Sequence, residues 1–303
     1  MGKQGTGMTV DDKLMHRIVR QALAEDIGSG DVTSEALVPA QTFARAFIVS
    51  RAPGVIAGLP VARDVFMQIS RKTRFRPLVR DGKRIRAGER VAEVRGPARA
   101  LLAGERVALN FLQRLSGVAT LTRRCVEAVG RHKVKIMDTR KTTPGLRALE
   151  KYAVRVGGGV NHRMGLYDQA LIKDNHLRAL LPEAGSLIEA VRLAVRRARD
   201  RVSRNTLVEV EADSLPMVAA AVEAAADIIM LDNMSLEAMR QAAHIVRAHR
   251  RRHHNDRPTT EASGGMTPKR VVAVAATGVD AISLGALTHS APALDLAMDI
   301  IEP

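Results

Sequence analysis

Charged, polar and glycine residues directly follow a series of short apolar runs in the second part of the chain. A single group of this kind has an ordinary structural explanation, such as a helix cap or a buried ion pair. A succession of them favours an active site, because the strands of a β/α barrel end at one common mouth. The groups are Asp138 to Lys141, Lys173 to His176, Glu209 with Glu211, Asp232 with Asn233, Ser263 to Gly265, and Gly285.

Two opposite sets of charge are expected to meet at this mouth. The cationic set suits a substrate with several negative charges, because a guanidinium group binds carboxylates and phosphates through two parallel hydrogen bonds. Its members are Arg140, Lys141, His162, Arg163 and Lys173. The anionic pair, Glu211 and Asp232, suits a hard cation such as Mg²⁺, which proteins usually share with substrate phosphates. Glu209 and Glu211 are expected to point to opposite sides of their strand, so that only Glu211 faces the site.

Turns that contain glycine supply a third kind of binding group, the backbone amide. The backbone amides of Ser263 to Gly265, and those near Gly285, can approach a phosphate closely because no Cβ atom intervenes. The residue types together predict a substrate with two or three negative charges and a metal-bound pyrophosphate. Asp174 to His176 are expected to shape the loop after their strand.

The elements that position these residues alternate between strand and helix. Such alternation, with apolar strands, predicts a parallel sheet covered by helices, and its extent predicts an α/β barrel. The predicted strands are Val134 to Asp138, Ala170 to Ile172, Thr206 to Val210, Asp227 to Leu231, Thr260 to Ala262 and Ala281 to Leu284. Helical spacing is found between them in Leu187 to Ala198, Leu215 to Ala225 and Leu236 to Arg247.

The first third of the chain has a different pattern. A helix over Asp11 to Glu25 precedes short β-like runs separated by glycine and proline, which predicts a small α/β domain with a largely antiparallel sheet. The runs are Ala44 to Ser50, Gly54 to Ala57, Arg74 to Arg80 and Arg90 to Arg95. Leu101 to Ala128 is predicted to be a long helix or a helix pair, broken at Ser116 and Gly117.

Composition excludes several classes of protein. The net charge of +15 invites a nucleic-acid-binding interpretation, but only 2% of the residues are aromatic, whereas single-strand platforms need aromatic side chains. The basic run Arg247 to Arg252 and the residues His253 to Pro258 that follow it are interpreted as a mobile loop. Cys125 is the only cysteine, which excludes an intramolecular disulfide and favours the cytoplasm. No apolar run reaches membrane-spanning length, and residues 1–8 resemble an extension.

The block DTRKTTPGLRALEKYAVRVGGGVNHRMGLYDQALIKDNH, from Asp138 to His176, resembles the signature of the quinolinate phosphoribosyltransferase family. Further blocks agree in order along nearly the whole chain: EDIGSGDVTS from Glu25, GPARALLAGERVALNFLQRLSGVAT from Gly96, VEVEA from Val208, IIMLDNMS from Ile228, EASGGMT from Glu261, and TGVDAISLGALTHSAPALDLAM from Thr277. The resemblance implies an N-terminal α/β open-sheet, sandwich-like domain over residues 1–118, completed by the tail 290–303. A seven-stranded α/β barrel, resembling a TIM barrel, would occupy residues 119–289.

The resemblance also implies a reaction and roles for individual residues. Quinolinate would receive the phosphoribosyl group of phosphoribosyl pyrophosphate and lose CO₂, giving nicotinate mononucleotide, with Mg²⁺ and no organic cofactor. The chain would form a homodimer or a larger homo-oligomer in which Arg106 reaches the neighbouring site. Quinolinate would be bound by Arg106, Arg140, His162, Arg163 and Lys173. Phosphoribosyl pyrophosphate would be bound by Thr139, Lys141, Lys173, Glu211, Asp232, Ser263, Gly264, Gly265, Ser283, Leu284 and Gly285, with Glu211 and Asp232 also holding Mg²⁺.

Three other functions stay open from the residues alone. A paralogue of the molybdenum-transport-associated type would share the scaffold and act on another substrate, but the full cationic set favours a dicarboxylate. A nucleic-acid-binding protein would bind with a steep salt dependence, and no nucleic-acid-reading motif is recognisable. A non-catalytic scaffold leaves the charged strand ends unexplained.

Overall fold

The protein divides into two compact units in a computed structural model that describes residues 10–302. The first unit comprises the chain up to Arg123, Thr142–Gly159 and the chain from Leu287. The second comprises Arg124–Lys141 and Val160–Ala286. The extension expected at residues 1–8 lies outside the described residues, and the domain limits expected at residues 118 and 289 stay predictions.

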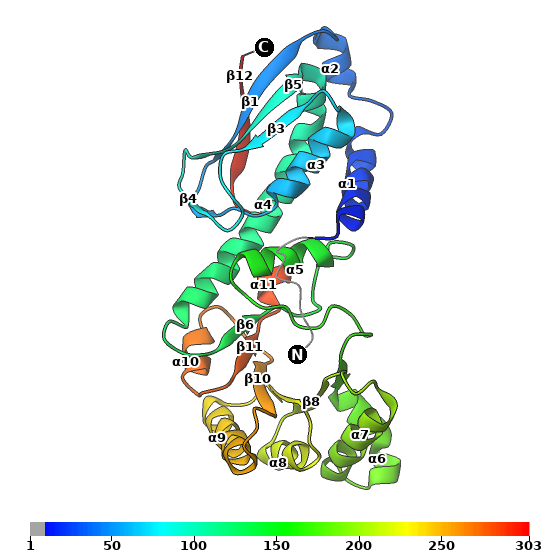
Figure 1. Ribbon diagram of the computed structural model, residues 1–303, viewed down its shortest axis with the longest axis vertical. Coiled ribbons are helices and arrows are strands. Elements are labelled where there is room, and N and C mark those ends of the chain that lie inside the picture. The colour runs from blue at the N-terminus through cyan, green and yellow to red at the C-terminus, as the bar shows by residue number, and fades with distance from the viewer. Residues whose placement is uncertain (1–9, 303) are drawn as a thin grey trace. The chain divides into compact units, whose positions relative to one another are not determined.

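A four-stranded antiparallel sheet forms the centre of the first unit (Figure 1). Its order is β12-β1-β5-β3, so that a strand from the C-terminal end of the chain pairs with β1. The central strands β1 and β5 are largely buried, which explains their apolar composition. The strands are β1 (Phe43–Ser50), β3 (Arg74–Pro77), β5 (Arg90–Pro97) and β12 (Leu296–Glu302), with a separate ribbon of β2 (Gly54–Val55) and β4 (Arg84–Ile85).

Helices accompany this sheet. Helix α3 packs against both β3 and α1, and the side chain of Asp11 caps α1 by accepting a hydrogen bond from the backbone N–H of Leu14 at 2.8 Å. The helices of the first unit are α1 (Asp12–Ile27), α2 (Val32–Leu37), α3 (Leu59–Ile69), the larger part of α4 (Ala98–Ala128), and α5 (Arg147–Val156).

The predicted break in the long helix was wrong, because α4 runs without interruption through Ser116 and Gly117. The hydroxyl of Ser116 accepts a hydrogen bond from the backbone N–H of Ala57 at 3.0 Å. At Gly117 a Cβ atom would collide with the backbone carbonyl oxygen of Pro292. The two residues therefore permit close approach of neighbouring segments to the helix rather than ending it.

Glu93 on β5 is a buried carboxylate that is compensated by three arginines of the same sheet. Its oxygens accept hydrogen bonds from Arg45 Nε at 2.6 Å, Arg76 Nε at 2.8 Å and Arg95 Nε at 2.7 Å. Burial opposes ionisation of Glu93, but the hydrogen bonds from Arg76, Arg95 and Arg45 outweigh it and lower its pKa to about 2. Glu93 is therefore ionised at any ordinary pH.

A six-stranded, entirely parallel sheet forms the second unit, in the order β6-β11-β10-β9-β8-β7. The strand predictions were right in number and order, and Ala170–Ile172 was predicted to the residue. The strands are β6 (Lys135–Met137), β7 (Ala170–Ile172), β8 (Val208–Ala212), β9 (Ile228–Asp232), β10 (Thr259–Ser263) and β11 (Ala281–Ser283).

The seventh strand implied by the resemblance is reduced to one parallel bridge between Met137 and Val160, next to β6. Two backbone amides shortly after Val160 are hydrogen-bonded to side chains. His162 N–H donates to Asp138 Oδ1 at 2.9 Å, and Arg163 N–H donates to His162 Nδ1 at 2.7 Å. Since these donors are already used, the segment cannot extend the strand ladder beyond Val160.

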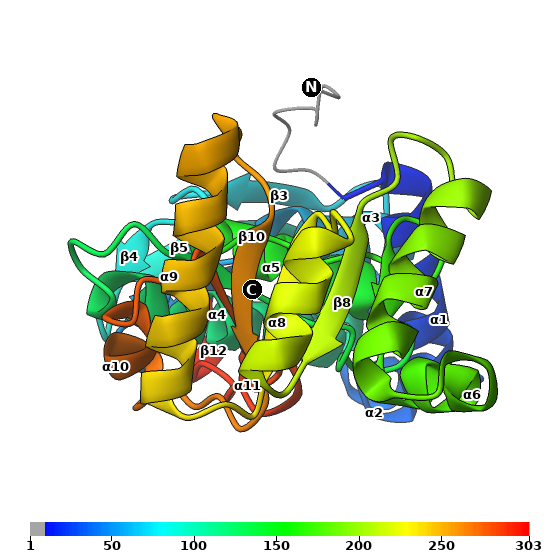
Figure 2. The same cartoon turned by 90° about the horizontal axis from the view of Figure 1, so that it is seen from below.

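Helices line the strands of this unit, and Figure 2 shows α7, α8 and α9 running beside β8 and β10. Val208, Val210 and Ala212 of β8 are fully buried, which is the packing expected for a sheet covered by helices. Among the described residues, no helix is long and apolar enough to cross a membrane. The helices are α6 (Asp174–Ala184), α7 (Leu187–Arg201), α8 (Leu215–Glu223), α9 (Leu236–His253) and α10 (Val271–Ala275), followed by α11 (Ala286–His289) at the boundary of the units.

The mobile loop predicted from Arg247 to Pro258 was wrong over its first part, because Arg247 to Arg252 form the last turns of α9. The helix ends at His254, whose left-handed backbone acts as its C-cap. Basic side chains in a last turn interact favourably with the negative end of the helix dipole. Arg250 also forms an ion pair with Asp280, with Nη2 and Oδ2 2.8 Å apart. The run is thus explained by helix stability.

Candidate active site

A cavity of about 620 Å³ opens in the second unit where the parallel strands end. Its lining mixes cations, carboxylates and glycines from every strand of the sheet and from the segment after Val160. It is lined by Thr139, Arg140, Lys141, His162, Arg163, Leu171, Lys173, Glu211, Met230, Asp232, Asn233, Glu261, Ser263, Gly264, Gly265 and Ser283.

The cavity gathers all of the predicted site residues except Arg106, Leu284 and Gly285. Arg106 lies on α4, in the first unit. Leu284 is fully buried, and its backbone N–H donates to the carbonyl oxygen of Met137 at 2.9 Å. Leu284 and Gly285 thus follow β11 just outside the lining residues.

The cationic part of the cavity centres on Arg163. Its guanidinium group is held by the backbone carbonyl of Gln169, 3.0 Å from Arg163 Nη1. Burial, followed by the charge of Arg140, lowers the pKa of Arg163. Two guanidinium groups that repel one another beside a cavity create a positive potential, which an anionic ligand would relieve.

The acidic part contains Glu211 after the middle of β8 and Asp232 at the end of β9. Lys173 Nζ lies 3.1 Å from Glu211 Oε1, and the backbone N–H of Asp174 donates to Glu211 Oε2 at 3.4 Å. Asn233 Nδ2 donates to Asp232 Oδ2 at 3.0 Å. Both side chains line the cavity, and a pair of carboxylates is an oxygen donor set that fits Mg²⁺.

A glycine turn after β10 closes another side of the cavity. Gly264 and Gly265 have φ values of +77° and +55°, which side-chain-bearing residues rarely adopt. A Cβ atom on Gly264 would collide first with the side-chain amide of Asn233 and would also lie 2.7 Å from Asp232 Oδ1, whereas on Gly265 its nearest neighbour would be Arg270 Nη1 at 3.5 Å. Gly264 is therefore required for the close approach of this turn to the acidic residues.

The loop after β7 is fixed by a side chain, as expected for Asp174 to His176. His176 Nδ1 accepts a hydrogen bond from the backbone N–H of Lys173 at 2.9 Å. This bond fixes the first turn of α6 and the backbone from which the Lys173 side chain extends into the cavity.

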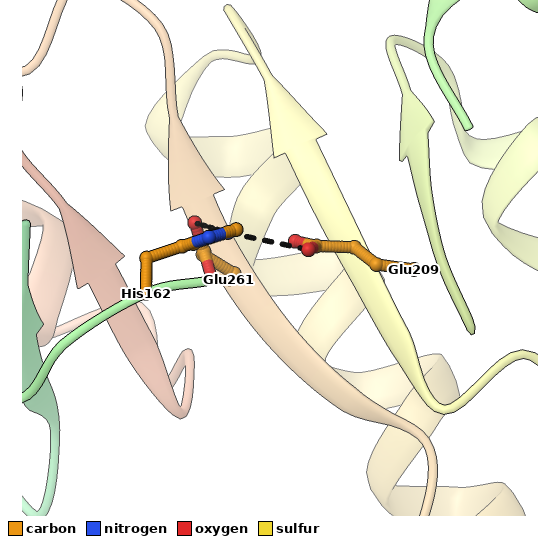
Figure 3. Close-up of side chains that lie close together, drawn as sticks. All are labelled: His162, Glu209 and Glu261. Carbon is orange, nitrogen blue, oxygen red and sulfur yellow. Dashed lines mark ion pairs between the residues drawn. The ribbon is translucent and has the colours of Figure 1, made fainter. Parts of the chain in front are cut away.

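The expectation that only Glu211 faces inward was wrong in its geometry. Residues two apart on a strand point to the same side, so Glu209 and Glu211 share a face. Glu211 lines the cavity, while Glu209 is fully buried beside His162. Figure 3 shows Glu209, His162 and Glu261 converging from three different segments.

Glu261 was missed by the sequence predictions, although it lines the cavity and is 2% exposed. Strand alternation contained the signal, because Glu261 lies two residues before Ser263 on β10 and must share its face. Leu171 and Met230 are the other lining residues that were not predicted, whereas Asn233 was expected at this strand end without an assigned role.

The fold and this cavity define an enzyme site at the end of a parallel α/β sheet, suited to anionic, phosphate-bearing substrates. Comparison with known proteins agrees. Residues 31–116 match the quinolinate phosphoribosyl transferase N-terminal domain, and residues 118–299 match its C-terminal domain. The chain therefore belongs to the quinolinate phosphoribosyltransferase family.

Individual relatives match over nearly the whole chain. A carboxylating nicotinate-nucleotide pyrophosphorylase of Mycobacterium leprae is 44% identical over 287 residues, covering 93% of this chain and 95% of that protein. A decarboxylating quinolinate phosphoribosyltransferase of Nicotiana tabacum is 36% identical, covering 93% and 81%. The solved nicotinate-nucleotide pyrophosphorylase of Francisella tularensis has a TM-score of 0.86 at 38% identity, covering 97% of this chain and 98% of that one.

Proposed function

We propose that this protein transfers the phosphoribosyl group of phosphoribosyl pyrophosphate to quinolinate, releasing pyrophosphate and CO₂ and forming nicotinate mononucleotide for NAD biosynthesis. The observation that carries this proposal is the division of one cavity into a cationic part, an acidic pair and a glycine turn. Those three parts suit a dicarboxylate, a ribose with its metal-bound pyrophosphate, and a phosphate, respectively.

Arg140, Arg163 and Lys173 hold the two carboxylates of quinolinate in this proposal, with His162 beside them. The pyridine nitrogen is thereby directed at C1′ of the ribose, and this orientation lowers the entropic part of the barrier. Once the nitrogen is quaternary, it stabilises the carbanion that remains at C2 when the neighbouring carboxylate leaves as CO₂, and C2 then takes up a proton from solvent to give nicotinate mononucleotide. The protein's contribution to that step is to orient and partly desolvate the carboxylate.

Glu211 and Asp232 bind the ribose hydroxyl groups and, we propose, Mg²⁺. Bound Mg²⁺ would neutralise charge on the departing pyrophosphate. Lys141 faces the pyrophosphate, with Thr139 beside it, and the negative charges of Glu211 and Asp232 favour positive character at C1′ as the bond to pyrophosphate weakens. The turn Ser263 to Gly265 and the segment Ser283 to Gly285 bind the 5′-phosphate through their backbone amides.

A homodimer completes the site in this proposal. Arg106 of one chain would enter the cavity of its neighbour and add a further cation for quinolinate. The same chain is proposed to act in the cytoplasm, where the buried thiol of Cys125 stays reduced.

An assay with purified protein, quinolinate, phosphoribosyl pyrophosphate and Mg²⁺ tests the reaction by following nicotinate mononucleotide and CO₂ together. Arg140→Ala, Lys173→Ala and Arg106→Ala are each expected to raise the KM for quinolinate by about 10- to 150-fold, because a hydrogen bond to a charged group contributes roughly 1.5–3 kcal/mol. Arg252→Ala, at an exposed position in the last turn of α9, is the matched control and should leave the KM unchanged. Folded wild-type protein that makes no product from quinolinate, but uses nicotinate, would refute the proposed substrate.

A further inference from the structure

Three buried ionisable side chains meet at the cavity wall: His162, Glu209 and Glu261 (Figure 3). Glu209 and Glu261 are 0% and 2% exposed, and His162 is 9% exposed. The distance from His162 Nε2 is 3.2 Å to Glu209 Oε2 and 3.6 Å to Glu261 Oε1. His162 and Glu261 line the cavity, so the charge state of this cluster is felt by any bound substrate.

The hydrogen bonds of the cluster identify which nitrogen of His162 carries its proton. Nδ1 accepts from the backbone N–H of Arg163 at 2.7 Å, so the ring proton is on Nε2, directed at the carboxylates. The imidazole is therefore neutral. Glu209 Oε2 also accepts a hydrogen bond from Gln169 Nε2 at 2.5 Å.

Glu261 has no comparable compensation. The groups that face it are the carboxylates of Glu209 on β8 and Asp138 after β6, which raise its pKa, and the ring of His162 and the hydroxyl of Ser283 on β11, which lower it. Ionising Glu261 would place a second buried negative charge within 4.8 Å of the His162 and Glu209 ligand atoms. Buried like charges at that separation are strongly disfavoured.

We propose that Glu261 carries a proton in the form of the protein that binds substrate and, as a neutral acid, maintains the His162–Glu209 arrangement that positions Arg163 for the quinolinate carboxylate. This inference rests on the proposed function, because it assumes that Arg163 binds substrate. Glu261 and His162 are positioning residues in it, since they act through Arg163.

A closed set of contacts links the charge state of Glu261 to the position of Arg163. Glu209 binds both the His162 ring and the Gln169 side chain. His162 Nδ1 holds the backbone of Arg163, and the carbonyl oxygen of Gln169 holds its guanidinium group at 3.0 Å. An ionised Glu261 would compete with Glu209 for the single Nε2 proton of His162 and would repel Glu209. His162 would then hold the backbone of Arg163 less firmly, and Gln169 would hold its guanidinium group less firmly.

The pKa of Glu261 also supports a protonated side chain. Burial, reinforced by the charge of Glu209, raises the pKa of Glu261 to about 7. A metal ion is the alternative occupant of three such ligands, but an imidazole nitrogen that bears a proton cannot coordinate one. The proton therefore explains the cluster with the hydrogen bonds already present.

Thermal stability against pH tests the protonation without any substrate. The folded pKa of Glu261 lies above its unfolded value of 4.5, so wild-type stability should fall as the pH rises from about 4.5 to about 7 and then level off. Glu261→Gln replaces the neutral acid by a neutral isostere and removes that fall. The variant should therefore have a higher Tm than wild type at pH 8, and the difference should vanish near pH 5. Glu93→Gln is the matched control, because Glu93 is ionised throughout this range and its replacement should lower the Tm by a constant amount.

Substrate kinetics tests the positioning role. The KM of wild type for quinolinate should rise above about pH 7, approaching about tenfold per pH unit for the loss of one proton. In Glu261→Gln this pH dependence should be absent, whereas Glu261→Ala should have a raised KM at every pH, with a smaller change in kcat. Identical Tm and KM profiles for wild type and Glu261→Gln would overturn the inference. So would one equivalent of divalent metal in purified wild type that is missing from Glu261→Gln. If no quinolinate turnover is found, the proposed function fails, while the Tm profile still decides the protonation of Glu261.

Discussion

The two glycines of the turn after β10 allow a paired perturbation of the candidate phosphate site. Gly264→Ala and Gly265→Ala both place a Cβ atom on a residue with positive φ, which costs about 1–2 kcal/mol for each. Only the Cβ at position 264 also collides with neighbouring side chains, first with the Asn233 amide and then with Asp232 Oδ1, which lies 2.7 Å away. At position 265 the nearest atom is at 3.5 Å, an ordinary contact.

Gly264→Ala should be destabilised by roughly 1–3 kcal/mol beyond the shared backbone strain, because its Cβ atom overpacks against Asp232 and Asn233. If Asp232 must move to relieve it, the KM for phosphoribosyl pyrophosphate should rise by about 5- to 150-fold beyond the rise in Gly265→Ala. Initial rates with phosphoribosyl pyrophosphate varied at saturating quinolinate and Mg²⁺ measure this difference, and urea unfolding measures the shared strain. Equal KM values in two equally folded variants would refute the assignment of Asp232 to the phosphoribosyl pyrophosphate site.

Two further predictions concern stability in the first unit. Gly117→Ala should destabilise the protein by about 1–3 kcal/mol, because its Cβ atom collides with the carbonyl of Pro292; a urea midpoint equal to that of wild type would contradict the contact. Tyr152→Phe should cost about 1.5–3 kcal/mol, because the Tyr152 hydroxyl donates to the half-buried Asp81 carboxylate, and thermal unfolding of the variant against wild type measures the loss.

Local pattern was sufficient for most elements of the second unit. The run Ala170 to Ile172 is short, apolar and bounded by polar residues, and it is a strand with those limits. The helix at Leu236 was predicted to end at Arg247 but continues to His253, because arginine is a good helix former and the basic turns suit the helix dipole. Net charge along a segment is thus a poor indicator of a loop when the apolar spacing before it is helical.

In the long helix α4, contacts with distant segments overrode the local sequence pattern. Ser116 and Gly117 have low helix propensity, so the sequence favoured a break there. In the fold, the hydroxyl of Ser116 binds the backbone of Ala57, and Gly117 accommodates the carbonyl of Pro292. Both partners are distant along the chain, and no local pattern reveals them.

The sequence by itself determined the succession of strands and helices, the parallel sheet, and the charged residues that strand ends bring to one cavity. Periodicity and residue type are local properties, and parallel strands necessarily end on the same side. Only the tertiary structure decided how the charges are compensated. It placed Glu209 and Glu261, from strands separated by β9, against the same ring of His162. Ionisation depends on burial and on the distance between groups that are remote in sequence, and both are fixed only when the chain packs.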